Sequence, residues 1–314
     1  MITVIVCTYN RSESLRKTLS SLGQLSAADG SWELVVVDNN SDDHTAEVVR
    51  RFAETASFPT RYFFEIKQGL SYARNAGIRS ARGEIIAFTD DDVVVDPHWL
   101  SELQRTFDQF ECIGVGGRIV AVWSCGKPSW LATDGPHSFR SGTVVSFDQG
   151  AKPCELRIPP VGANMAFKKV AFERYGLFRT DLGKRGNDPM IGEETEFCAR
   201  LARARERLVY APNAIVHHPV AKVRLTKTHF QSHYFHYGRY NARTNSVPEN
   251  AKAYLGVPRY LFRSLLERSC KWLLAFGSQK RFRRRLEFFE TLGEIYETYR
   301  LKEKRDQENL EIVE

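Results

Sequence analysis

The sequence predicts an α/β fold, in which a mostly parallel central sheet is flanked by helices and followed by a helical C-terminal extension. Three observations predict it. Strand-like and helix-like stretches alternate with short links over about the first 110 residues, a pattern typical of a parallel sheet covered on both faces. From there to about residue 222 the strands are less regularly spaced. After Thr228 the remaining pattern is helical.

The first four expected strands are short runs rich in β-branched residues, and a helical pattern follows each of them. The helix that begins at Ser12 places Leu15, Leu19 and Leu22 on one face. Pro97 suits the first turn of the fourth helix, where its missing N–H costs nothing. The expected strands are 3–7, 32–37, 61–66 and 84–89, and the helices start at 12, 45, 71 and 97.

The later elements divide the chain into two domains. Further strands are expected at 113–122, 143–147, 161–167, 207–210 and 214–217, and further helices at 193–205, 229–243, 258–276 and 278–304. The change to helix alone places a boundary near residue 222. We therefore predict a first domain over 1–222 and a helical, basic extension over 223–314.

Composition limits the class of protein. The 42% hydrophobic and 26% charged content is that of a globular chain. The six cysteines are scattered without a C-x-x-C pair, which disfavours a zinc site or a disulfide scaffold and favours a cytoplasmic protein. Neither a signal peptide nor an apolar run of about 20 residues that could span a bilayer is visible.

The net charge of +7 is concentrated in one segment. Residues 259–287 hold nine Lys or Arg and two Glu, so the excess of this segment equals that of the whole chain. The rest is nearly neutral, which does not indicate a nucleic-acid-binding surface. Interleaved Leu261, Leu265, Trp272 and Phe276 lie near helical spacing. Segment 259–288 is therefore either a peripheral contact with the inner face of a membrane or a helix docked on the core or a partner.

Polar clusters follow three of the expected strands. Asp90-Asp91-Asp92 ends the fourth strand, Asp38 ends the second, and Thr8-Tyr9 follows the first. Ligands of open parallel sheets bind beyond the carboxyl ends of the strands, so these clusters are expected to converge. Carboxylates together with phosphate oxygens suit Mg²⁺ or Mn²⁺, whereas an Asp-rich turn exposed to water is the plainer alternative. Neither G-x-G-x-x-G nor a P-loop motif is present.

Seven segments follow one another along the chain: 3–11, 35–41, 69–77, 88–92, 162–167, 192–197 and 214–217. Their order and spacing resemble those of family-2 glycosyltransferases with the GT-A fold. Over about residues 1–220 the chain resembles this family, in particular its bacterial polysaccharide-biosynthesis members. The resemblance implies a hexosyltransferase-like enzyme that moves a sugar from a UDP-, GDP- or dTDP-sugar. It further implies a glycan or polyprenyl-linked acceptor and Mg²⁺ or Mn²⁺ as cofactor.

The resemblance also implies roles for individual residues. The donor would be held by Thr8, Tyr9, Arg11, Asp38, Gly69, Arg74, Asp90 and Asp91. Asp90 and Asp92 match the D-x-D of the family, and His217, after the last core strand, would either join Asp90 and Asp92 as a metal ligand or bond to backbone. Asn164 is placed at the acceptor. Apart from the resemblance, Trp130 is also expected there because it lies in the irregular loop, although aromatic residues at such positions more often belong to the core.

Glu193 and Glu194 begin a helix after Gly192. Direct displacement at an anomeric carbon needs a base at the acceptor hydroxyl and a cation at the departing diphosphate, and it inverts the configuration. Glu194 matches the second acid of the family's Glu-Asp motif, with Glu193 as its rival. Both could instead serve the helix N-terminus alone. The alternatives are a sugar nucleotidyltransferase, disfavoured because no early Gly-rich triphosphate loop is present, and a non-catalytic scaffold that binds membrane or glycan.

Overall fold

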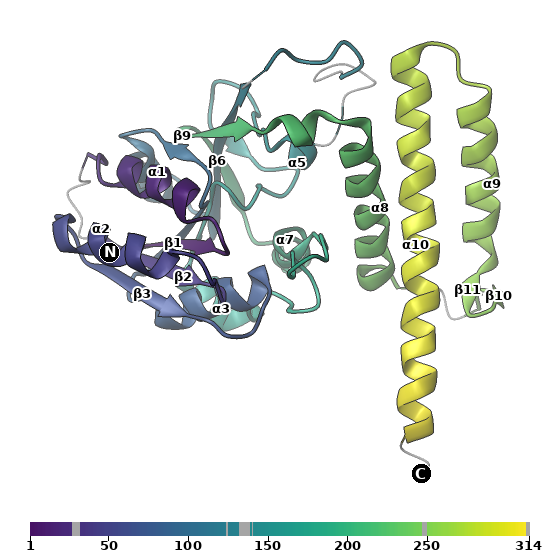
Figure 1. Cartoon of the computed structure of the whole chain (residues 1–314), viewed down its shortest axis with the longest axis horizontal. Helices are drawn as coiled ribbons and strands as arrows, with labels where there is room; N and C mark the ends of the chain where they lie inside the picture. Colours follow the sequence, from purple (N-terminus) through teal and green to yellow (C-terminus); the bar gives the residue numbers. More distant parts are fainter. Residues whose placement is uncertain (27–31, 124, 132–138, 140, 247–249, 312–314) are drawn as a thin grey trace. The chain divides into compact units, whose positions relative to one another are not determined.

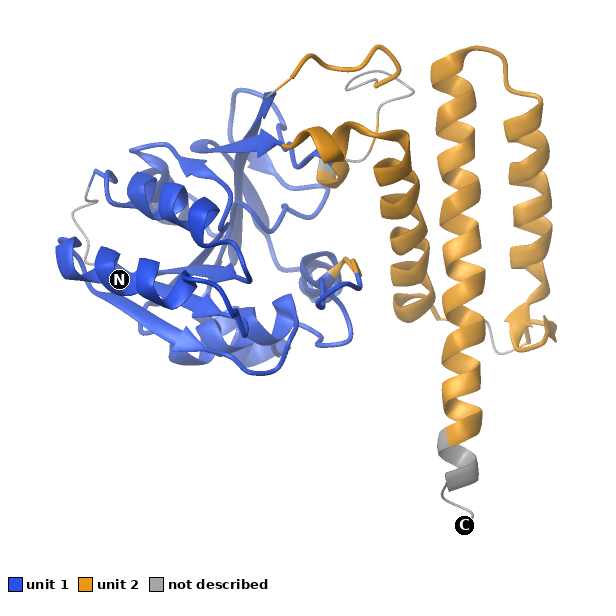
Figure 2. Ribbon diagram, in the orientation of Figure 1, with its two compact units in different colours: residues 1–124, 144–188, 193–220 blue, residues 125–143, 189–192, 221–314 orange. Residues whose placement is uncertain are grey.

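The computed structural model describes residues 1–26, 32–123, 125–131, 139, 141–246 and 250–311. It consists of two compact units (Figure 2). Unit 1 comprises 1–124, 144–188 and 193–220, and unit 2 comprises 125–143, 189–192 and 221–314. Segments 125–143 and 189–192 thus belong to the helical unit, although they lie inside the first domain expected from the sequence.

Unit 1 is built on a central sheet in the order β3-β2-β1-β4-β8-β6-β9-β5, with β7 on β9. The half from β3 to β4 is parallel, and β8 runs antiparallel to both β4 and β6. The strands are β1 Ile2–Thr8, β2 Trp32–Asp38, β3 Thr60–Phe64, β4 Ile85–Asp90, β5 Val94–Val95, β6 Gly114–Trp123, β7 Cys154–Glu155, β8 Met165–Lys168 and β9 Leu208–Val220.

Helices of unit 1 pack on the sheet (Figure 1). They are α1 Ser12–Leu22, α2 Thr45–Thr55, α3 Leu70–Ser80, α4 Trp99–Gln109, α6 Lys169–Tyr175 and α7 Glu193–Arg203. Side chains of β1 and β2 enter two separate hydrophobic clusters, with Val4 and Val36 in one and Ile5 and Val37 in the other. Alternate residues of a strand point to opposite faces, so both faces of this sheet are buried, as the sequence predicted.

Part of the sequence-based assignment was wrong. The expected strand 143–147 is mostly absent: a short helix, α5 (Ser141–Val144), occupies its start, and Phe147 alone forms a bridge with Ile119. The β-branched run Thr143-Val144-Val145 suggested a strand, but Val145 has a φ of 51°, which extended structure cannot accept. The two short strands expected at 207–210 and 214–217 are one long strand, β9.

Unit 2 contains the helices α8 (Lys227–Thr244), α9 (Arg259–Leu273) and α10 (Ser278–Glu311), together with the short η1 (Lys222–Leu225), β10 (Ala253–Tyr254) and β11 (Val257–Pro258). α10 packs against both α8 and α9 (Figure 1). Between α8 and α10, the buried carboxylate of Glu297 accepts hydrogen bonds from Arg239 at 2.6 Å and from Arg243 at 2.8 Å. Because a buried charge is tolerable only when it is paired, these bonds fix the two helices together.

Two glycines allow α8 and α10 to approach closely. A Cβ atom on Gly238 would lie 1.8 Å from the carbonyl oxygen of Glu290, and one on Gly293 would lie 1.9 Å from that of Phe235. Gly238→Ala is therefore expected to lower the free energy of unfolding by at least about 1–3 kcal/mol, the usual cost of overpacking, because backbone must move. Urea unfolding followed by circular dichroism measures this. Gly126→Ala is the control, since no atom lies within 4 Å of its new Cβ; equal stability of the two variants would contradict the expectation.

Candidate active site

The expected polar clusters do meet at one edge of the sheet. The parallel register pairs Thr8 with Asp38 and Cys7 with Asp90, so β1, β2 and β4 end side by side. This edge is the carboxyl end of the parallel strands, where ligands of such sheets bind. The site described below is built from the turns that leave these strands, with additions from β9 and α7.

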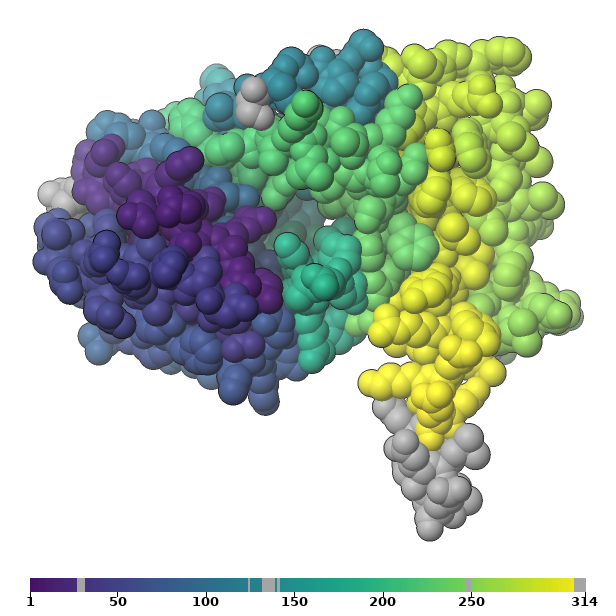
Figure 3. Space-filling view, in the orientation of Figure 1, coloured from purple at the N-terminus to yellow at the C-terminus, as the bar shows by residue number. Residues whose placement is uncertain are grey.

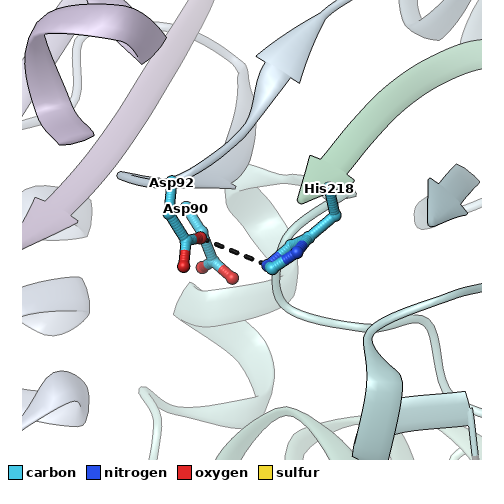
Figure 4. Close-up of side chains that lie close together, drawn as sticks. All are labelled: Asp90, Asp92 and His218. Carbon is cyan, nitrogen blue, oxygen red and sulfur yellow. Dashed lines mark ion pairs between the residues drawn. The ribbon is translucent and has the colours of Figure 1, made fainter. Parts of the chain in front are cut away.

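Asp90, Asp92 and His218 form a candidate metal site (Figure 4). One ligand atom from each lies within 4.8 Å of those of the other two. Asp90 is the last residue of β4, Asp92 lies in the turn after it, and His218 belongs to β9. In Figure 4 the two carboxylates lie next to each other and the imidazole points toward them. Two carboxylates and one imidazole form a donor set that a divalent cation accepts.

The hydrogen bonding of His218 supports that assignment. Its Nδ1 lies 3.0 Å from the carbonyl oxygen of Pro219, which requires a proton on Nδ1 for a hydrogen bond. The buried Nε2 makes no hydrogen bond within the described residues and faces Oδ1 of Asp92 at 3.2 Å. A lone pair directed at a carboxylate is repelled unless a proton or a cation lies between them. A backbone carbonyl on the other ring nitrogen is also the usual support of a metal-bound histidine.

His217, the histidine expected as a ligand from the sequence, is not the one beside the acidic cluster. Adjacent residues of a strand point to opposite faces, and it is His218 that is turned toward Asp92. His217 pairs in register with Val94 of β5 and Val120 of β6 and is half-buried. The structure thus brings the neighbouring His218, rather than His217, to the acidic cluster.

Arg11 compensates the charge of the acidic turn. Its Nη1 lies 3.1 Å from Oδ1 of Asp91 and 2.9 Å from Oδ2 of Asp92. Burial raises the pKa of Asp91 to about 6, against the opposing effect of the Arg11 charge. The sequence placed Arg11 and Asp91 at the donor, whereas here they pair with each other. This ion pair also holds Asp92, so that its other oxygen is the one that faces His218.

Arg74 links the acidic turn to the start of α7. Its buried guanidinium lies 2.5 Å from Oε1 of Glu193 through Nη1 and 3.8 Å from Oδ1 of Asp90 through Nη2. Space for it exists because residue 162 is glycine: a Cβ there would lie 2.3 Å from Nη2 of Arg74. Arg74, expected close to the nucleoside, is thus enclosed between two carboxylates. A sequence pattern does not show this, because the partners lie about 15 and 120 positions away.

Glu193 and Glu194 are held differently, although they are neighbours in α7. Glu193 is buried in its ion pair with Arg74. Glu194 is half-buried, and burial together with the negative charge of Glu193 raises its pKa well above the ordinary glutamate range, with Arg74 acting in the opposite direction. A carboxylate with a raised pKa accepts a proton near neutral pH, as a general base must. Of the two, Glu194 is therefore better suited to that role.

Asp38 has partners on both of its oxygens. Oδ1 accepts a hydrogen bond from the backbone N–H of Ser41 at 2.9 Å, and Oδ2 accepts one from the hydroxyl of Tyr62 at 2.8 Å. Tyr62 was not expected from the sequence. Asp38 of β2 pairs in register with Phe64 of β3. Tyr62 lies two residues before Phe64, so it is the diagonal neighbour of Asp38.

The other residues expected at the donor lie around Asp38. Thr8 is buried at the end of β1, and its side chain lies beside Asp91. Tyr9 is exposed. Gly69 starts α3 with a φ of 143°, which favours glycine, and its N–H donates to Oδ1 of Asn39 at 2.7 Å. Asn39, which follows Asp38 in the polar cluster after β2, thereby joins the end of β2 to the start of α3.

The two residues expected at the acceptor both make contacts inside the protein. Asn164 is fully buried: its Oδ1 accepts from the indole of Trp99 at 2.8 Å, and its Nδ2 donates to the carbonyls of Arg118 and Ala214. Its amide is thus occupied. Trp130 belongs to unit 2, where its ring packs edge-to-face against Phe139, Phe230 and Phe282 with centroids 5.1–6.4 Å apart. These ring contacts are those of the core alternative for Trp130, and its place at the acceptor stays a prediction.

Comparisons with known proteins agree with this geometry. The model of a family described as glycosyl transferase family 2 matches residues 3–176. Glucosyl-dolichyl phosphate glucuronosyltransferase of Haloferax volcanii is 28% identical over 71% of this chain and 70% of its own. The succinoglycan biosynthesis protein ExoM of Rhizobium meliloti is 29% identical over 74% and 72%.

Solved structures share the fold. A mannosyltransferase from Pyrobaculum calidifontis in complex with GDP-Man and Mn²⁺ superposes with a TM-score of 0.62 at 19% identity, over 94% of this chain and 87% of that one. GalNAc-T7 with UDP, GalNAc and Mn²⁺ superposes with a TM-score of 0.55 at 16% identity, over 77% and 51%. These likenesses establish the GT-A fold that the sequence predicted.

Proposed function

The chain belongs to glycosyl transferase family 2, and from that premise we propose that it transfers a sugar with inversion, assisted by a divalent metal, to a glycan or lipid-linked acceptor. It is a glycosyltransferase that uses nucleotide sugars and has the GT-A fold. The inversion, the metal dependence and the acceptor class are the proposed part.

Asp90, Asp92 and His218 would hold the cation. When bound, Mg²⁺ or Mn²⁺ neutralises charge that develops on the departing diphosphate. The imidazole of His218 favours Mn²⁺ over Mg²⁺, which prefers oxygen ligands alone. Asp38, Thr8 and the exposed ring of Tyr9 lie where the nucleoside would bind, at the ends of β1 and β2.

Glu194 would act as the base. In a single displacement, the acceptor oxygen forms a bond to the anomeric carbon while the bond from that carbon to the diphosphate oxygen breaks. The hydroxyl proton passes to the carboxylate of Glu194, and the anomeric configuration is inverted. Glu193 remains bound to Arg74 and is not available to accept the proton.

One observation carries the proposal: Arg74 lies against both Asp90 and Glu193, at 3.8 and 2.5 Å. This contact joins the metal-binding turn to the residue next to the base within unit 1. A cation site and a base are the two groups that displacement at an anomeric carbon requires. The contact that ties the turn of Asp90 to the start of α7 therefore supports the proposal.

A donor panel tests the proposal. UDP-, GDP- and dTDP-sugars, each with and without Mn²⁺, are added to the full chain, and the thermal midpoint is followed. A true donor is expected to raise the midpoint as its concentration rises, and to do so more with Mn²⁺, because a ligand that binds only the folded state stabilises it. If no donor shifts the midpoint, or if Mn²⁺ makes no difference to the shift, the metal-assisted proposal fails.

The acceptor class is proposed from the names of the relatives. One is named for action on a dolichyl phosphate and another for succinoglycan biosynthesis. No helix in the described part of the chain is both long and apolar enough to cross a bilayer. We propose that segment 259–288 makes a peripheral contact with a membrane, one of the two alternatives from the sequence.

A further inference from the structure

α9 carries large apolar side chains on the face turned away from its neighbours. Phe262, Leu266 and Leu273 are 38%, 67% and 66% exposed, and in the connection to α10 Leu274 and Phe276 reach 74% and 89%. At about 100° per residue, the three helical positions fall within a sector of about 40°. We call these five residues the outer stripe.

Among the described residues, the ring contact of the outer stripe is that of Phe262 with Tyr254 of β10, with centroids 6.4 Å apart. The buried Leu261 and the half-buried Trp272 lie about 100–120° around α9 from the centre of the outer stripe, and the ring of Trp272 lies 5.5 Å from that of Phe288 on α10. Arg285 of α10 also lies over Trp272. Figure 3 shows the surfaces of α9 and α10 beside each other. A helix that is apolar on two faces and uses only one of them internally leaves the other for a partner.

Exposed cations lie along α9 and at the start of α10, and at about 100° per residue those at positions 259 and 263 border the outer stripe on one side. The cations are Arg259, Arg263, Lys271, Lys280 and Arg281, and Glu267 is the exposed acid among them. An apolar stripe bordered by Lys and Arg is complementary to anionic lipid, with side chains among the acyl chains and cations at the phosphates. In a symmetric pair of copies the same patch would meet itself and bring these cations together, which is unfavourable.

We propose that the outer stripe and its cations bind the surface of an anionic bilayer. The inference deepens the proposed peripheral location and rests on it. The outer stripe of α9 enters the lipid, whereas the face of α9 that carries Trp272 packs against α10. The occupant is lipid rather than a second protein.

Sedimentation of the full chain with vesicles tests this. Phosphatidylcholine vesicles with about one quarter phosphatidylglycerol should bind the protein, and pure phosphatidylcholine vesicles should bind it at least about tenfold more weakly. The variant Leu266→Ser/Leu273→Ser/Phe276→Ser should lose at least about tenfold in affinity, because each side chain no longer enters the lipid. Val223→Ser, which changes an apolar residue of unit 2 that is 70% exposed, should bind as the parent does.

The outcomes separate this inference from the proposed reaction. A triple variant that binds vesicles as the parent does overturns the inference. The inference is also overturned if the parent does not bind vesicles but forms a concentration-dependent dimer that the triple variant does not form. Donor-induced thermal shifts should be unchanged in the triple variant, since its substitutions lie in unit 2. If no donor shifts the thermal midpoint of the parent, the proposed function fails, whereas the result with vesicles is unaffected.

Discussion

Asp92→Asn is expected to weaken Mn²⁺ binding by at least about 100-fold. Removal of a group that hydrogen-bonds to a metal ligand already lowers metal affinity by about 10–100-fold, and loss of the ligand itself should cost no less. The turn should persist, because Asn has nearly the same size and can still accept a hydrogen bond from Arg11. Sugar transfer should fall by about 10²–10³-fold, as when one group that stabilises the transition-state charge is removed. Isothermal titration with Mn²⁺, in the presence of the nucleoside diphosphate of the true donor, measures the affinity.

The two adjacent histidines supply a matched pair for the same experiment. His218→Gln is expected to weaken Mn²⁺ binding, since the Nε2 that faces Asp92 is lost. His217→Gln should leave it nearly unchanged, because that side chain lies on the other face of β9. The reverse result would return the third ligand to the position expected from the sequence. Unchanged Mn²⁺ affinity in Asp92→Asn would remove the metal site altogether.

Glu194→Gln is expected to lower kcat by about 10²–10⁴-fold, the usual contribution of a general base. In the parent enzyme, kcat/KM should rise with pH through the raised pKa of Glu194, hence above the ordinary glutamate range, because the active form is the carboxylate. The variant should lose this rising limb. Initial rates of sugar transfer, measured from about pH 5 to 9, give both quantities.

The stability of the same variant should change in the opposite direction to its activity. The native state holds the Glu194 proton more tightly than the unfolded chain, whose glutamate pKa is about 4.3. Above that pH the unfolded state binds fewer protons, so the free energy of unfolding falls as pH rises, until the raised native pKa is passed. Glutamine removes this fall, and Glu194→Gln should therefore be more stable than the parent near neutral pH.

Glu193→Gln is the control, and its stability should move the other way. It leaves the guanidinium of Arg74 buried without its closest carboxylate, a change that typically costs about 3–5 kcal/mol. Urea unfolding at pH 7.5 compares the two variants. If Glu193→Gln is the variant that loses the rising limb of the pH profile, then Glu193 is the base and the assignment of roles in α7 is reversed.

Much of unit 1 was predictable because its core strands are local features. The runs that became β1, β2 and β4 are short and apolar, and each is followed by a helix, so their parallel order and the edge where they end follow from connection rules. The convergence of Asp38 with the acidic turn needed nothing more. The family resemblance added the expected importance of the glutamates at the start of α7.

The details that were not predictable depend on tertiary register. Which of His217 and His218 faces Asp92 is decided by the pairing of β6 with β9, which shifts between Gly117 and Arg118. A shift of one residue reverses the face of every side chain in a strand. Asn164 has a residue type suited to binding, but its amide is used by backbone carbonyls and Trp99 that no local pattern reveals.

The glycines at the crossing of α8 and α10 have a consequence for the outer stripe. Each helix meets the backbone of the other where it has no side chain, at Gly238 and Gly293. If α10 moved along α8, a side chain would enter the close contact between the two backbones. The two helices therefore pack together at one axial position. α9 is held on α10 through Trp272, and it inherits this alignment. The two glycines thus fix the position along α8 at which α10, and with it α9 and the outer stripe, is held.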